Sequence, residues 1–187
     1  MSNSHIHPDG PVAALKSMVA SGEMRRDPKQ LKAAERLEAL TDRLKGYKPQ
    51  PKQKKSSGFL ALLGLNGGSG DAQATPKGLY VFGPVGRGKS MLMDLVFDHA
   101  DVARKRRVHF HEFMIEVHDT IHAWRQSTDK PKDEIDPLPR IAREIAGKSA
   151  LLCFDEFHVT NIADAMMLGR LFEGFFDAGV VVVATSN

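Results

Sequence analysis

The stretch Gly83-Pro84-Val85-Gly86-Arg87-Gly88-Lys89-Ser90 of this 187-residue chain lies between a short apolar run and a longer amphipathic run. It fills every fixed position of the phosphate-binding pattern G-x-x-x-x-G-K-[ST]. The apolar residues before it predict a strand, and the amphipathic residues after it predict a helix. Its glycines let backbone N–H groups and the positive end of that helix face a polyphosphate. In this pattern Lys89 reaches the β- and γ-phosphates and the Ser90 hydroxyl binds Mg²⁺. The flanking elements disfavour a chance glycine turn, so the stretch predicts a nucleoside triphosphate site.

A second segment ends in two carboxylates. Residues 150–154 form a continuous apolar run, typical of a strand buried on both faces, and Asp155 and Glu156 follow it. Ligands bind at the carboxyl ends of the strands in open α/β sheets. We therefore expect Asp155 to hold Mg²⁺ through its water shell and Glu156 to take a proton from the attacking water, or to orient it. The alternative is a solvated acidic pair that caps the next helix. No Asn-Lys-x-Asp segment that would read guanine is present, which favours ATP over GTP.

A third polar group follows the last apolar run, residues 180–184. Asn187 is our candidate for contacting the γ-phosphate and the attacking water, with Thr185 and Ser186 as weaker candidates. Such residues are also common in turns and at helix caps, so this evidence is modest by itself.

Strand and helix patterns alternate along the second half of the chain. This alternation predicts an α/β fold with a parallel sheet covered by helices on both faces. We expect strands at 78–82, 107–111, 150–154 and 180–184, and helices at 88–99, 112–126, 137–147 and 161–177.

The first half divides into a helical segment, residues 1–45, and a linker, residues 46–75. Residues 11–20 predict a short helix, and a second helix starts with Asp27 as N-cap, Pro28 at its first position and Gln30 able to complete a capping box. Its apolar stripe is expected to pack on the core or on a neighbouring subunit. The linker is rich in Lys, Pro, Gly and Ser, so we expect it to be mobile. Residues 76–187 then form the nucleotide-binding core.

Charge and composition limit the class of protein. Residues 1–60 hold 12 Lys and Arg against 6 Asp and Glu, and the overall formal charge is +3. The basic excess gathers in the expected linker without interleaved aromatic residues, which favours a solvated linker over a nucleic-acid or lipid site. The single cysteine, Cys153, rules out an internal disulfide framework and fits a reducing compartment. With no leader and no apolar run long enough to cross a bilayer, we expect a cytoplasmic bacterial protein.

Two histidines sit one helical turn apart. His118 and His122 have the spacing of zinc ligands on a helix, but Asp119 stands where a metalloprotease helix has its catalytic Glu. No third ligand is marked by spacing, so solvated or partner-facing histidines are the favoured interpretation.

Several blocks together resemble one family. The phosphate loop, Val108-His109-Phe110-His111-Glu112-Phe113-Met114, Asp155-Glu156-Phe157-His158-Val159 and the final Val183-Ala184-Thr185-Ser186-Asn187 are similar to the ATPase family of the bacterial cell division protein ZapE and the mitochondrial lactation elevated protein. This family belongs to the AAA+ ATPases. The resemblance implies that Asn187 is the γ-phosphate sensor, and that the last core strand, a trans-acting arginine and a C-terminal lid lie beyond this chain. The AAA+ strand order 5-1-4-3-2 would then leave the strand at 78–82 at an edge.

The resemblance also implies a function. We expect an ATP-hydrolysing machine that forms a homo-oligomer in its full-length form and remodels a protein partner, possibly the tubulin-like division-ring protein. The present chain alone is expected to hydrolyse ATP poorly. The alternatives are a chaperone or adaptor ATPase in protein quality control, and an ATP-gated binding scaffold without turnover. A nucleic-acid partner is disfavoured.

Overall fold

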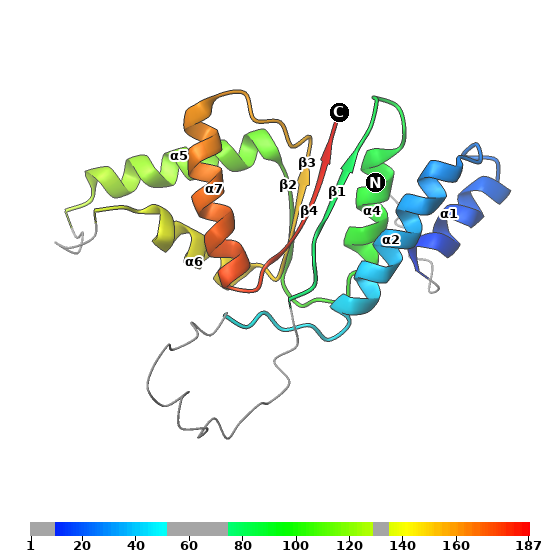
Figure 1. Ribbon diagram of the computed structural model, residues 1–187, viewed down its shortest axis with the longest axis horizontal. Coiled ribbons are helices and arrows are strands. Elements are labelled where there is room, and N and C mark those ends of the chain that lie inside the picture. The colour runs from blue at the N-terminus through cyan, green and yellow to red at the C-terminus, as the bar shows by residue number, and fades with distance from the viewer. Residues whose placement is uncertain (1–9, 52–74, 129–134) are drawn as a thin grey trace, which may run out of the picture.

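Four parallel strands form the centre of the molecule in a computed structural model that describes residues 10–51, 75–128 and 135–187 (Figure 1). Each strand except the last is followed by helical segments, as the alternating sequence pattern predicts. The strands are β1 (Leu79–Phe82), β2 (Lys105–His109), β3 (Leu151–Asp155) and β4 (Val181–Ser186), and the described helices are α1 (Pro11–Ala20), α2 (Pro28–Leu44), α4 (Lys89–His99), α5 (Phe110–Gln126), α6 (Leu138–Lys148) and α7 (Ile162–Asp177).

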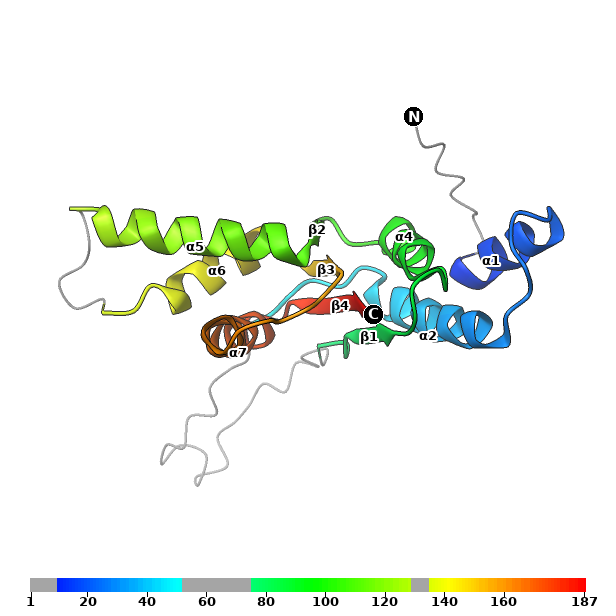
Figure 2. The same cartoon turned by 90° about the horizontal axis from the view of Figure 1, so that it is seen from above.

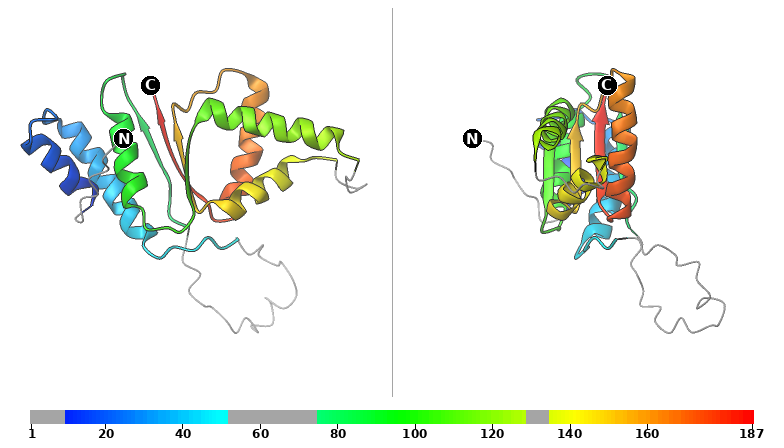
Figure 3. Two further views of the ribbon diagram at one scale, coloured as in Figure 1. Left: turned by 180° about the vertical axis from the view of Figure 1, so that it is seen from behind. Right: turned by 90° about the vertical axis from the view of Figure 1, so that its left-hand side faces the viewer.

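The strand order is β1-β4-β3-β2, so β3 and β4 are central and β1 and β2 form the edges. This order is the one expected from the family resemblance, with β1 at an edge. The register places Phe82 opposite Ser186 and His109 opposite Asp155. Because all four strands run the same way, their carboxyl ends meet at one edge of the sheet (Figures 1 and 3).

Apolar side chains alternate between two clusters on the two faces of the sheet. Leu151 and Cys153 pack with α4, α1 and α2, whereas Leu152 and Phe154 pack with α5, α6 and α7. In Figure 2, α4 and α7 lie on opposite sides of the strands. The two-sided burial explains why β3 reads as a continuous apolar run.

The N-terminal helices belong to the first of these clusters. The apolar stripe of α2 contacts α4, which confirms the expected packing on the core. Asp27 caps α2 by accepting a hydrogen bond from the Lys29 N–H at 2.8 Å. The expected capping box is wrong, however. The Gln30 amide instead donates to the carbonyl of Arg87 at 2.9 Å, because α4 and its loop lie beside the start of α2.

One strand is displaced from its predicted position. We expected a strand at 107–111, but β2 spans Lys105–His109 and α5 begins at Phe110. The strand therefore includes Lys105, a charged residue whose partners lie on a neighbouring element. The ammonium of Lys105 donates to the carbonyls of Phe97 at 2.6 Å and Ala100 at 3.1 Å, at the end of α4.

The predicted linker lies largely outside the described residues, which resume at residue 75. In its first part Tyr47 is buried, and its hydroxyl donates to the carbonyl of Gly179 at 2.7 Å. This contact ties the segment after α2 to the turn before β4. None of the helices that the structure describes is long and apolar enough to cross a membrane.

Candidate nucleotide-binding site

A cavity of about 180 Å³ opens where the carboxyl ends of the strands meet the start of α4. It brings together residues that are far apart in the sequence, from the loop after β1, the turn after β3 and the end of β4. Its lining residues are Val85, Gly86, Gly88, Lys89, Ser90, Glu156, Thr185, Ser186 and Asn187. All but Thr185 and Ser186 were our first-choice candidates for binding or catalysis, and those two were the weaker candidates.

The glycine-rich loop has the backbone that its sequence requires. Gly86 and Gly88 have φ values of 76° and 73°, in the left-handed region that favours glycine. Gly88 is the N-cap of α4, so the helix N-terminus opens toward the cavity. The ammonium of Lys89 donates to the carbonyls of Gly83 at 2.7 Å and Pro84 at 2.8 Å. These contacts keep the cation folded over the loop that is expected to hold phosphate.

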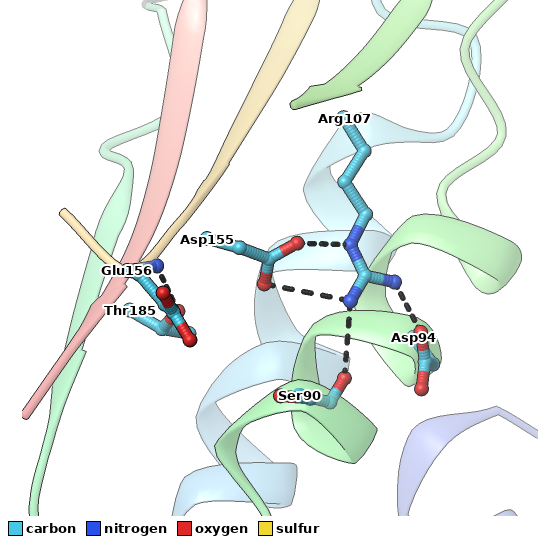
Figure 4. A network of polar contacts seen from close by, with 6 residues as sticks. All are labelled: Ser90, Asp94, Arg107, Asp155, Glu156 and Thr185. Atoms are coloured by element: carbon cyan, nitrogen blue, oxygen red, sulfur yellow. Dashed lines mark hydrogen bonds and ion pairs between the residues drawn. The ribbon is translucent and has the colours of Figure 1, made fainter. Parts of the chain in front are cut away.

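Asp155 ends β3 as a buried carboxylate with an arginine partner (Figure 4). The Arg107 Nε donates to Asp155 Oδ2 at 2.6 Å, and Nη2 lies 3.4 Å from Oδ1. The same guanidinium binds Asp94 of α4, and its Nη2 lies 3.5 Å from the Ser90 carbonyl. Partial burial opposes the charge of Arg107, but its hydrogen bonds to Asp155 and Asp94 outweigh that effect and raise its pKa. Arg107 is thus a permanent cation at the carboxylate expected to hold the metal.

Glu156 adopts a backbone conformation that is costly for its residue type. Its φ is 54°, and it is the one residue other than glycine with positive φ in the described part of the chain. Two contacts with Thr185 hold this turn: the Glu156 N–H lies 3.3 Å from Oγ1 of Thr185, and the Phe157 N–H donates to its carbonyl at 2.6 Å. The turn leaves the Glu156 side chain exposed and lining the cavity, away from the buried position of Asp155. Strain of this kind is found where a site requires a defined side-chain direction.

The three polar residues after β4's apolar run have different surroundings. Thr185 holds the Glu156 turn, and the Ser186 hydroxyl lies 2.5 Å from the Tyr80 hydroxyl. Asn187 is exposed and lines the cavity beside the phosphate loop. The geometry therefore favours Asn187 over its two neighbours as the group that meets a bound phosphate.

The donor set at this edge fits Mg²⁺. This ion prefers oxygen ligands, keeps several waters and uses one or two carboxylates together with substrate phosphates. Ser90 supplies a hydroxyl at the start of α4, and Asp155 supplies a carboxylate at the end of β3. The two histidines with zinc-like spacing have other partners, since His118 contacts Asp164 at 2.9 Å and His122 contacts Gln126 at 2.9 Å.

A second and larger cavity, of about 520 Å³, adjoins the loop on the side of α2. One wall comes from the phosphate loop and the other from the first turns of α2. It is lined by Asp27, Lys29, Gln30, Ala33, Val81, Phe82, Gly83, Pro84, Arg87, Lys89 and Leu92. The Arg87 guanidinium lies 3.8 Å from the Asp27 carboxylate, and Gln30 holds the Arg87 carbonyl. The N-terminal helices and the loop are therefore coupled at this cavity.

The sequence did not identify two residues that contact the site, Arg107 and Gln30. The sequence analysis assigns no role to Arg107, although an arginine in the strand that neighbours the carboxylate strand was a usable signal. Gln30 was assigned to a helix cap. Its partner is 57 residues away, and no local pattern points to it.

Known proteins resemble this chain along almost its whole length. Residues 10–187 match the model of a family described as AFG1-like ATPase. Lactation elevated protein 1 homolog B of Danio rerio is 41% identical over 209 residues, which cover 94% of this chain and 42% of that protein. Cell division protein ZapE of Escherichia coli K12 is 39% identical over 179 residues, 95% of this chain and 45% of that protein. The chain thus spans less than half the length of these relatives.

A solved structure shares the fold. The structure of DnaI superimposes with a TM-score of 0.51 at 18% sequence identity, covering 89% of this chain and 70% of that one. At this identity the likeness concerns the fold alone, which is that of a P-loop ATPase of the AAA+ type.

Proposed function

The chain belongs to the AFG1-like ATPase family, and from this premise we propose that its strand-end cavity binds the phosphates of ATP with Mg²⁺ and hydrolyses the terminal one. One observation carries the proposal. The phosphate loop from Val85 onward, the exposed carboxylate of Glu156 and the side chain of Asn187 line the same small cavity, although Val85 and Asn187 are 102 positions apart in the sequence.

Each group has a role that follows from its position. The N–H groups of residues 85–90, at the start of α4, surround the β- and γ-phosphates, and Lys89 exchanges its loop carbonyls for phosphate oxygens. Ser90 and Asp155 hold Mg²⁺, which neutralises charge on the phosphates when it is bound. Glu156 takes the proton of a water that attacks the γ-phosphorus, and the bond to the oxygen bridging the β- and γ-phosphorus breaks. Asn187 orients that water and the γ-phosphate.

The nucleoside end occupies the larger cavity between the loop and α2. Its volume of about 520 Å³ lies in the range of small-molecule sites, and it continues directly from the phosphate loop at Gly83 and Pro84. In this arrangement α2 contacts the ligand through Lys29 and Gln30, and ATP stabilises the packing of the N-terminal helices on the loop.

Two substitutions test the site on this chain and on the longer protein. Lys89→Ala removes the cation that meets the phosphates, so ATP binding measured by calorimetry should fall at least about a hundredfold. Glu156→Gln keeps the shape of the side chain and loses the base, so binding should persist while phosphate release in the longer protein stops. Equal ATP affinity in Lys89→Ala and the unsubstituted chain would overturn the site, and full turnover in Glu156→Gln would remove Glu156 from its role.

The role of the whole protein is a separate proposal. ZapE is a cell division protein by name and 39% identical to this chain. On this basis we infer that the longer form of the present protein assembles into a homo-oligomer in the bacterial cytoplasm and uses ATP to remodel a protein of the division ring, with the tubulin-like ring protein as the first candidate. Co-sedimentation of that protein's polymers with the longer protein, with and without ATP, is the test. Binding that ignores ATP and leaves the polymers unchanged would refute the remodelling role.

A further inference from the structure

One guanidinium touches both elements that are expected to hold the metal. Arg107, on β2, binds Asp155 at the end of β3 with Nε at 2.6 Å, and its Nη2 reaches toward the carbonyl of Ser90 at the start of α4 (Figure 4). Arg107 therefore extends from the Asp155 carboxylate toward the start of α4. Mg²⁺ shared by Ser90 and Asp155 would have to bind the same carboxylate.

The charges around Arg107 are not balanced one to one. It lies between two carboxylates, the buried Asp155 and the half-exposed Asp94 of α4, and it hydrogen-bonds to both. Asp155 needs a cation at all times, because an uncompensated buried carboxylate is costly. Asp94 is 55% exposed, so water can solvate it when the arginine is elsewhere.

We propose that Arg107 and Mg²⁺ compete for Asp155, and that Asp94 is the alternative partner that holds Arg107 when the metal takes Asp155. This inference rests on the proposed binding of ATP with Mg²⁺. Because arginine stays charged at every accessible pH, the competition is between two cations and not between a cation and a proton. The side chain of Arg107 is 25% exposed and already contacts Asp94, so a small rotation completes the exchange.

The competition has a physical consequence that a purely structural ion pair lacks. A guanidinium beside the metal repels it, so removing the guanidinium charge should tighten Mg²⁺ binding. Removing Asp94 takes away the alternative partner and leaves Arg107 on Asp155, so it should weaken Mg²⁺ binding. If Arg107 merely positioned Asp155 for the metal, its loss would weaken Mg²⁺ binding instead.

The test is a titration of Mg²⁺ into the chain in the presence of a fluorescent, non-hydrolysable ATP analogue. The Mg²⁺ concentration at half-saturation should fall about tenfold in Arg107→Met, as expected for one unit charge a few ångströms away in a partly screened site. In Asp94→Asn it should rise several-fold. Arg107→Lys keeps the charge but loses the paired N–H donors of the guanidinium. Its Mg²⁺ concentration at half-saturation should lie between those of the unsubstituted chain and Arg107→Met.

The neighbouring arginine offers a matched control. Arg106 lies on the same strand, binds Glu116 of α5 and lowers the pKa of that carboxyl through this hydrogen bond. Arg106→Met removes an equal charge away from the Ser90–Asp155 pair and should leave the half-saturation concentration unchanged.

The outcomes separate the inference from the function on which it rests. If the unsubstituted chain binds no analogue at any Mg²⁺ concentration, the proposed function fails and the inference fails with it. If it binds the analogue and Arg107→Met needs as much Mg²⁺ as the unsubstituted chain or more, only the competition is overturned. Should Arg107→Met fail to fold, Asp94→Asn decides the matter, because a half-saturation concentration that does not rise contradicts the role of Asp94.

Discussion

Strands β1 and β3 supply the two halves of the candidate site, and they have opposite surroundings. Both are apolar runs that lead into site residues. The phosphate loop follows β1, while Asp155 ends β3 and Glu156 follows it. In β3 every residue is buried, whereas in β1 Tyr80 is 57% and Phe82 is 76% exposed. β3 pairs with β2 and β4 and is covered on both faces, while β1 pairs with β4 alone within the described part of the chain. An apolar run thus predicts a strand, but its neighbours decide the burial.

Thiol labelling should give the largest contrast between the two strands. Burial raises the pKa of the Cys153 thiol in β3 to about 12, so the thiolate that reacts with disulfide reagents is scarce and enclosed. In Phe82→Cys the introduced thiol on β1 should react at least about a thousandfold faster than Cys153 at pH 8. Cys153 is slower because the reagent reaches it only in the small fraction of molecules that are transiently unfolded. Both rates come from a single trace with Ellman's reagent. Similar rates for the two thiols would show that β3 is not enclosed.

Removing one aromatic ring from each strand should also have very different effects on the free energy of unfolding. Phe154 is fully buried and packs against Phe110, Phe113, Phe157 and Phe172, so Phe154→Ala should lower the free energy of unfolding by about 3–5 kcal/mol. Phe82→Ala, at the exposed edge, should change it by less than about 0.5 kcal/mol. Urea denaturation of the two variants measures both values. A large loss in Phe82→Ala would mean that another part of the protein covers β1.

The turns after the two strands also differ, because the loop after β1 uses glycine at positive φ. Gly88→Ala places a Cβ in the left-handed region at φ 73°, where it also meets the Gln30 amide nitrogen at 3.0 Å. We expect a loss of about 1–2 kcal/mol in the free energy of unfolding. Gly147→Ala in α6 is the control, because its Cβ meets nothing within 4 Å and a helical alanine is favourable. Equal stability changes in the two variants would argue against the loop conformation.

A substitution in the turn after β3 should have the opposite effect on the free energy of unfolding, and the smallest effect of those considered. Glu156→Gly relieves the left-handed strain at φ 54°, so the chain should gain about 0.5–1 kcal/mol in the free energy of unfolding. Glu156→Gln keeps the strain and should leave stability unchanged, while both variants lose hydrolysis in the longer protein. Thermal unfolding of the pair separates the backbone from the carboxylate. A loss of stability in Glu156→Gly would show that the side chain stabilises the turn.

Much of the fold was predictable because its signals are local. The G-x-x-x-x-G-K-[ST] spacing, the apolar run before Asp155 and the stripe of α2 each lie within one element, and the elements formed where they were predicted to within two residues. The strand order followed from the resemblance to a family and not from the residues themselves. The predicted start of β2 was two residues late, and Lys105, which begins the strand, finds its partners at the end of α4, beyond any local window.

The sequence by itself determined the phosphate loop, the parallel α/β alternation and the candidate site residues, because periodicity and motif spacing are properties of neighbouring residues. The tertiary structure alone decided that Arg107 binds Asp155 and that Gln30 binds Arg87. The partners in these two contacts are 48 and 57 residues apart. Whether they meet depends on strand register and helix packing, which arise only when distant segments bury a common core.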